Sequence, residues 1–167
     1  MQSSADRGVV LAKLDDGDDL LASIEALAAK HRIGNGMVVW AIGMLRDFEV
    51  GYFNGREYER ETYRNCMELL SLHGTIAAEA DPKLHLHVAA AGTDHATVGG
   101  HLFRATVCVV NELCLWRLGQ TKLDRVLNPR SGLKELVLER LTERRPRGER
   151  VPRPSRASRS SRTSRGR

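Results

Sequence analysis

The sequence is poor in aromatic residues and contains no long hydrophobic run. Aromatic side chains make up 5% of the 167 residues, whereas all hydrophobic residues make up 41%. Aliphatic side chains must therefore fill most of the core, and the length suits one domain plus an appendage. No stretch approaches the roughly 20 apolar residues of a membrane-spanning helix, so we expect no integral membrane protein. The first eight residues lack the apolar segment of a secretory signal, which predicts a cytoplasmic location.

Cysteine is also scarce. The chain has three cysteines, an odd number, and they show no C-x-x-C spacing: Cys66, Cys108 and Cys114. This pattern argues against a disulfide framework and against a zinc ion held by cysteines. Each cysteine lies among apolar residues, so we expect three small buried side chains in a reducing compartment rather than reactive thiols.

Acidic residues are almost missing from one end of the chain. Residues 141–167 contain ten Arg and two Glu, whereas the whole chain contains 26 basic and 21 acidic residues. The remaining 140 residues are therefore mildly acidic, and the net charge of +5 is a property of the C-terminal segment. The folded part is not expected to present a basic surface to nucleic acid.

Hydrophobic periodicity predicts an α+β domain with a largely antiparallel sheet over residues 7–141. Apolar residues at helical spacing predict one main helix over 19–31, which Asp18 or Asp19 can cap. Asn54-Gly55 is a strong hairpin signal. Residues 1–6 resemble a frayed end, and 133–141 fit a short terminal helix. The expected strands cover residues 8–14, 37–45, 48–53, 58–65, 67–72, 75–80, 84–91 and 103–116.

The clearest chemical signal is a pair of histidines two residues apart. On a strand, His85 and His87 point to the same face, about 6 to 7 Å apart along the chain. His101 follows after enough residues to complete a strand and return beside the pair. Three His with one open position is the ligand arrangement of catalytic zinc sites. Copper or nickel would also fit, and a solvated strand face carrying two His is an equally good interpretation. Gly99 and Gly100 favour either close backbone approach or a turn.

Several segments, in order along the chain, resemble the PPC domain (plants and prokaryotes conserved). The resemblance extends from about residue 8 to residue 138. The H-x-H and G-G-H segments look like the family signature, and the segments before them match its earlier motifs. The matching segments are L-H-L-H-V at 84–88, V-G-G-H-L at 98–102, M-E-L-L-S-L-H-G-T-I at 67–76, A-I-G-M-L-R-D at 41–47, G-Y-F at 51–53 and L-D-D-G-D-D-L-L at 14–21.

This resemblance implies a fold, an assembly and a metal site. It implies a fold similar to that of acetolactate decarboxylase, with one main helix on a mixed, largely antiparallel sheet, and a homotrimer. Prokaryotic members look like zinc binders through the histidines that match His85, His87 and His101. Plant relatives join this domain to AT-hooks and act on AT-rich DNA.

Two further residues are candidates beside such a metal. Arg46 could hold a carboxylate or phosphate of a substrate in a bidentate manner. Glu68 could serve as a general base or orient a histidine ligand. The alternatives are an Arg46 paired with Asp47 or a backbone carbonyl, and a solvated Glu68 on a strand.

The C-terminal segment, 142–167, is rich in Arg, Ser and Pro and is expected to be disordered. Arg145-Pro146-Arg147-Gly148 begins like an AT-hook, but Glu149 stands where the second arginine should be. We therefore expect sequence-independent attraction to DNA or RNA rather than minor-groove readout. A merely solubilising tail is the alternative. The candidate nucleic-acid-binding residues are Arg144, Arg145, Arg147, Arg150, Arg153, Arg156, Arg159, Arg162, Arg165 and Arg167.

Three hypotheses about function follow. The first is a regulatory, zinc-binding homotrimer whose basic tail binds DNA largely without sequence preference. The second is a zinc-dependent lyase or hydrolase that acts on a small anionic substrate at the three histidines. The third is an oligomeric scaffold in which the histidines hold no metal.

Overall fold

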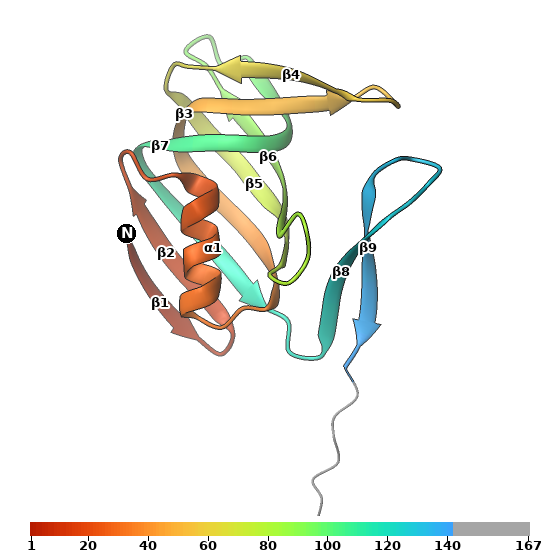
Figure 1. The fold of residues 1–167 in the computed structure, drawn as a ribbon. Coiled ribbons are helices and arrows are strands. Elements are labelled where there is room, and N and C mark those ends of the chain that lie inside the picture. Colours follow the sequence, from red (N-terminus) through yellow and green to blue (C-terminus); the bar gives the residue numbers. More distant parts are fainter. Residues whose placement is uncertain (142–167) are drawn as a thin grey trace, which may run out of the picture.

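A computed structural model describes residues 1–141, which form one antiparallel sheet, a helix and a separate hairpin (Figure 1). The seven-stranded sheet has the order β1-β2-β7-β6-β5-β3-β4, with β7 paired also to β3, and β8 pairs with β9. The predicted fold, an antiparallel sheet with one main helix, is confirmed within this range. The elements are β1 (Gln2–Asp6), β2 (Val9–Asp15), α1 (Leu20–Lys30), β3 (Asn35–Phe53), β4 (Tyr58–Tyr63), β5 (Met67–Ala77), β6 (Leu84–Ala91), β7 (Thr97–Arg117), β8 (Thr121–Leu127) and β9 (Lys134–Arg140).

The helix α1 covers one face of the sheet (Figure 1). Asp19, not Asp18, is its N-cap, and the Asp19 side chain accepts a hydrogen bond from the amide of Ala22. The buried face of the helix consists of Leu20, Ile24, Leu27 and Ala28, as the spacing predicts. No helix within the described residues is long and apolar enough to span a membrane.

The N-terminal residues form a strand rather than a frayed end. Gln2 to Asp6 pair with β2, although their side chains are almost all exposed. Arg7 and Gly8 both have positive φ, 47° and 89°, which is the geometry of a tight hairpin turn. Backbone pairing across this turn, rather than apolar burial, therefore builds β1.

Three strands are longer than the sequence predicts. β3 joins the expected runs 37–45 and 48–53, β5 joins the run 67–72 to the start of 75–80, and β7 extends back to include Gly99 and Gly100. Register shifts along the shared edge of β3 and β7 let both of these strands bend. A Cβ on Gly100 would lie 2.7 Å from the carbonyl oxygen of Gly51. The glycine pair therefore permits close backbone approach and does not make a turn.

Residues 134–140 form the strand β9, so the predicted terminal helix is wrong. All seven residues are exposed, and each pairs with a residue of β8. The apolar residues of the segment L-K-E-L-V-L-E-R-L fit both a helix and a strand, and only the pairing with β8 decides in favour of the strand. The hairpin is attached to the sheet by a hydrogen bond from the Leu123 amide to Asn35 Oδ1 (2.7 Å) and by an ion pair between Lys134 and Asp81 (2.6 Å).

The expectation for the cysteines is partly wrong. Cys66, directly before β5, and Cys108, in the middle of β7, form a disulfide with their Cα atoms 6.0 Å apart. Cys66 is exposed, whereas Cys114 is a buried free thiol as predicted. The two bonded cysteines are 42 residues apart in sequence, and only the sheet topology brings them together.

Candidate metal centre

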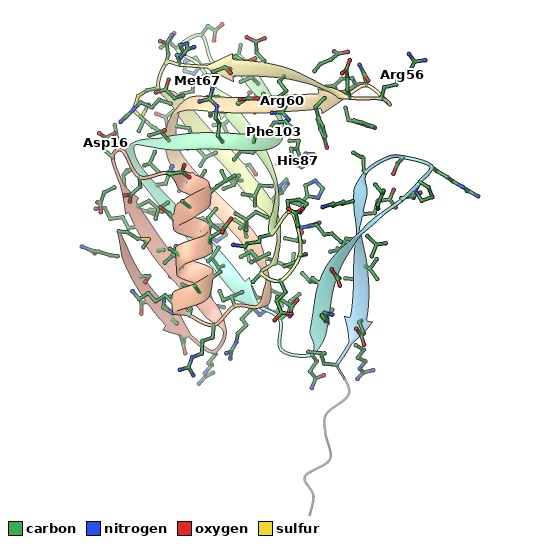
Figure 2. All side chains as sticks on the ribbon, in the orientation of Figure 1. Asp16, Arg56, Arg60, Met67, His87 and Phe103 are labelled. Atoms are coloured by element: carbon green, nitrogen blue, oxygen red, sulfur yellow. A yellow bond between two sulfur atoms is a disulfide. The ribbon has the colours of Figure 1, made fainter. Side chains whose placement is uncertain are left out.

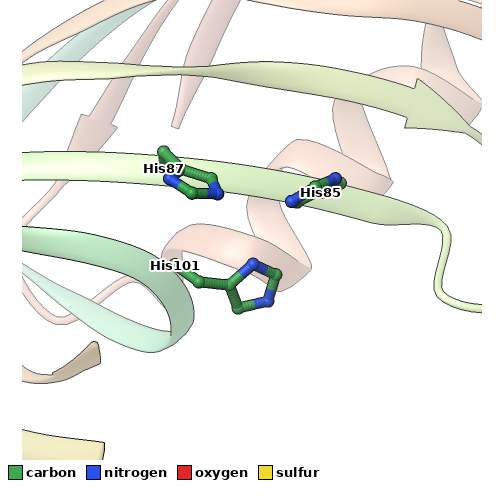
Figure 3. A group of neighbouring side chains, drawn as sticks. All are labelled: His85, His87 and His101. Carbon is green, nitrogen blue, oxygen red and sulfur yellow. The ribbon is translucent and has the colours of Figure 1, made fainter. Parts of the chain in front are cut away.

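Three histidines from two neighbouring strands face a common point (Figure 3). His85 and His87 lie two residues apart on β6, and His101 on β7 pairs directly with His87. Their ring centroids are 5.0 to 5.6 Å apart. One nitrogen from each ring can be chosen so that all three lie within 4.8 Å of one another. Strand alternation and the β6–β7 register therefore converge three nitrogen donors on one place.

The surroundings of these imidazoles favour their neutral form, although His85 and His87 are exposed and His101 is half-buried. Burial lowers the pKa of His85, His87 and, to about 4, His101, and neighbouring positive charge adds to this effect. A neutral imidazole carries a lone pair that a metal ion can accept. His101 Nδ1 is buried and has no hydrogen-bond partner among residues 1–141. A buried nitrogen without a partner fits a metal ligand, since such groups are otherwise costly.

The donor set fits zinc and leaves one position open. Zinc takes histidine nitrogens readily, and three histidine ligands are typical of sites that bind a further molecule. Copper and nickel accept the same donors. The three side chains therefore offer a metal site of the open kind, and the atoms around it determine what else can bind.

The histidines open onto the space between the sheet and the β8–β9 hairpin. In Figure 2, His87 lies on the side of the sheet that faces this hairpin. A cavity of about 460 Å³ is lined by His85, His87 and Leu136, and another of about 380 Å³ by His85, His101 and Leu136. The hairpin therefore supplies one wall of a concave site.

Arg46 and Glu68 do not lie at this site. The Arg46 guanidinium donates a hydrogen bond to Asp16, directly after β2. Glu68 is an exposed residue of β5. Neither residue lines the two cavities at the histidines. The structure therefore brings together the three predicted metal ligands but neither of the two predicted accessory residues.

Arg125 is the charged residue that sequence reasoning missed. It lies on β8, is 7% exposed and lines the 380 Å³ cavity with His85 and His101. Its Nε donates to the Pro82 carbonyl (2.8 Å) and its Nη2 to Thr75 Oγ1 (2.9 Å). One signal was present in the sequence: Leu123 and Arg125 lie two residues apart in a segment of strand length, so both side chains share one face.

The ten arginines proposed to bind nucleic acid lie beyond Leu141, outside the described residues. The expectation of a disordered segment over 142–167 concerns the same residues and stays a prediction.

Comparisons with solved structures support the fold. The chain is 29% identical to a metal-containing protein of Archaeoglobus fulgidus, with a TM-score of 0.70, 81% of this chain covered and 96% of the other. It is 26% identical to a candidate DNA-binding protein of Ralstonia eutropha JMP134, with a TM-score of 0.72 and coverages of 82% and 96%.

Among curated proteins, the bifunctional protein GlmU of Synechococcus sp. (strain JA-3-3Ab) is 28% identical over 135 residues, which is 80% of this chain. The chain spans only about a fifth, 21%, of the length of that relative. The model of the Plants and Prokaryotes Conserved (PCC) domain, also abbreviated PPC, matches residues 1–118. The chain therefore belongs to the Plants and Prokaryotes Conserved domain family.

Proposed function

We propose that this protein is a zinc-binding homotrimer with a regulatory role and a basic tail that binds DNA largely without sequence preference. The observation that carries the proposal is the convergence of His85, His87 and His101, whose donor atoms lie within 4.8 Å of one another. Partial burial of His101 and the unpartnered Nδ1 of that residue support metal ligation. The related protein of Archaeoglobus fulgidus, described as metal-containing, is consistent with it.

The charge distribution supports DNA binding through the tail. Ten Arg follow residue 141, and two Glu are the only acids among them. Each phosphate that an arginine neutralises releases counterions, which gives affinity without base recognition. The Ralstonia eutropha relative, described as a candidate DNA-binding protein, agrees with this part of the proposal. Three tails on one trimer would add avidity.

An apolar sheet face supports self-association. Val9, Trp116 and Met37 form one cross-strand row on β2, β7 and β3, and each is 38 to 50% exposed. The next row contains Leu11 and Trp40, which are 52% and 39% exposed. Soluble monomers rarely expose a contiguous apolar patch of this kind, so a second and third copy of the chain would cover it.

Elemental analysis of the untagged protein tests the metal site. We expect bound zinc in the purified wild type and a loss of most of it in His87→Ala, because two histidines hold zinc far less tightly than three. The matched control is His95→Asn, which changes a histidine in a loop away from the cluster and suits its positive φ of 62°. A wild type without any transition metal, or a His87→Ala variant that keeps its zinc, would contradict the proposal.

A second candidate function is a zinc-dependent lyase or hydrolase acting on a small anionic substrate. The observation that favours it is the concave site itself, in which the cavity beside His85 and His101 also contains the buried Arg125. Zinc, when bound, would supply a Lewis acid there, and Arg125 would orient an anionic group.

A further inference from the structure

Arg125 is a buried cation without an acidic partner. Its side chain is 7% exposed, and its two hydrogen bonds go to a backbone carbonyl and a hydroxyl, those of Pro82 and Thr75. No carboxylate within residues 1–141 forms an ion pair with it, and burial lowers its pKa. A guanidinium carries five N–H donors, so three of them remain for a ligand. A buried charge normally needs a counter-charge, so this arrangement is incomplete as it stands.

The other charged groups around the cavity are already engaged. Glu135 lines the cavity, but its Oε1 accepts hydrogen bonds from Asn128 (2.9 Å) and Ser131 (2.7 Å). Lys134 pairs with Asp81 at 2.6 Å. Arg60, whose charge lies near His101, pairs with Glu49 at 3.1 Å. Neutral histidines would not cancel any of the charge of a bound divalent ion. That ion would therefore add two positive charges beside the charge of Arg125.

We propose that Arg125 and the metal held by His85, His87 and His101 form a two-point site for a small oxyanion, a carboxylate or phosphate group. One oxygen takes the open metal position, and the remaining oxygens accept hydrogen bonds from the Arg125 guanidinium, whose planar fork matches such groups. This inference rests on the proposed metal site. It names the class of ligand that the site takes and assigns to Arg125 the role first considered for Arg46.

The shape of the cavity limits the rest of the ligand. Its volume is about 380 Å³, which is the size of a small-molecule site. Apart from the charged groups, its lining is largely apolar and comes from Tyr58, Pro82, Leu133 and Leu136. Two of these residues belong to the β8–β9 hairpin. The site therefore suits a small anion with a short apolar portion rather than a polymer.

Calorimetric titration of the full-length protein tests the inference, with inorganic phosphate and acetate as separate probes at 0.15 M salt. Zinc content is measured first. We expect zinc-loaded wild type to bind at least one anion more tightly than zinc-stripped wild type. Arg125→Gln should keep its zinc and bind that anion about tenfold more weakly, as the loss of a charge-assisted hydrogen bond implies. The stronger of the two probes identifies the class of oxyanion.

Arg130→Gln is the matched control, because it removes the same charge from an exposed position in the β8–β9 loop and should bind like wild type. If Arg125→Gln does not fold, Arg125→Lys replaces it, and a similar weakening is expected because the planar fork is lost. A wild type that takes up no zinc would overturn the proposed function. Zinc uptake without any zinc-dependent anion binding, or an Arg125 variant that binds like Arg130→Gln, would overturn only this inference.

Discussion

At the scale of single residues, the site depends on three histidines that the protein desolvates only in part, since His85 and His87 stay exposed and His101 is half-buried. His85, His87 and His101 lie on paired strands, and no carboxylate is among the residues that line the two cavities beside them, except for the engaged Glu135. Desolvation is the largest cause of the lowered pKa of all three rings. The same desolvation that prepares the nitrogens for a metal ion therefore makes the metal-free protein sensitive to acid.

The stability of the metal-free protein should fall as the pH decreases from 6.5 to about 4. The pKa of His101 is lowered from 6.5 to about 4, so the unfolded chain binds a proton within this range that the folded chain does not. Above pH 6.5 the imidazole of His101 is neutral in both the folded and the unfolded chain, so it no longer makes stability depend on pH. Thermal denaturation of zinc-stripped protein at pH 7.5, 5.5 and 4.5 measures it.

A His101→Gln variant provides the comparison for that series. This variant lacks the histidine whose pKa is lowered to about 4, so the melting temperature of the variant should change less than that of wild type between pH 7.5 and 4.5. Carboxylates with a lowered pKa, such as Asp16 and Glu49, begin to lose their contribution near pH 4.5, but they do so in both proteins and cancel in the comparison. Equal pH dependence in the two proteins would show that the histidines do not cause it.

At the scale of elements, long, closely paired strands position the residues of the site. β3 and β7 each continue through segments that the sequence divides, and register shifts bend them without ending them. Gly74 shows how closely the strands approach: its φ is 157°, and a Cβ there would lie 1.9 Å from the carbonyl oxygen of His85. The β5–β6 pairing that places His85 therefore requires glycine at position 74.

The Cys66–Cys108 disulfide joins two of these elements and should stabilise the oxidised protein. We expect Cys66→Ala to lower the free energy of unfolding by about 2–4 kcal/mol, since the bond closes a long loop in the unfolded chain. Urea denaturation with and without a reductant measures the difference. In reductant, wild type and variant should unfold at similar urea concentrations, and a persisting difference would assign the effect to lost packing instead.

The same pair tests the predicted cytoplasmic location. Structural disulfides are rare in the cytoplasm of most organisms. Rapid alkylation of cells, followed by mass spectrometry of the peptides that contain Cys66 and Cys108, reports which state the protein has where it works.

At the scale of the whole molecule, the chain separates into an acidic folded part and a basic tail. Residues 141–167 contain ten of the 26 basic residues. The exposed apolar rows around Trp40 and Trp116 lie on the folded part, so the proposed DNA binding and the proposed self-association depend on different residues.

Deletion of residues 142–167 should therefore abolish DNA retention and leave the oligomer intact. The physical reason is that the deletion removes ten Arg and two Glu and leaves a chain that is net acidic, while the apolar sheet face stays unchanged. Binding to duplex DNA at increasing salt, together with light scattering of both proteins, measures the two properties. DNA binding that survives the deletion would place the interface on the folded part.

Much of this molecule follows from local pattern in the sequence. The spacing of apolar residues determines α1, the alternation around His85 and His87 places both rings on one face, and the composition separates the tail from the domain. The family motifs carried the resemblance that the domain match confirms. These features depend on residues that are close together in the chain.

Tertiary structure decided everything that depends on distant partners. Cys66 meets Cys108 only because strands of the same sheet bring them together, and residues 134–140 are a strand only because β8 pairs with them. Arg125 rather than Arg46 lies beside the histidines because the hairpin is attached near Asn35 and Asp81. Local periodicity carries no information about such long-range contacts. The H-x-H pair was therefore visible in the sequence, whereas the charged neighbour Arg125 was not.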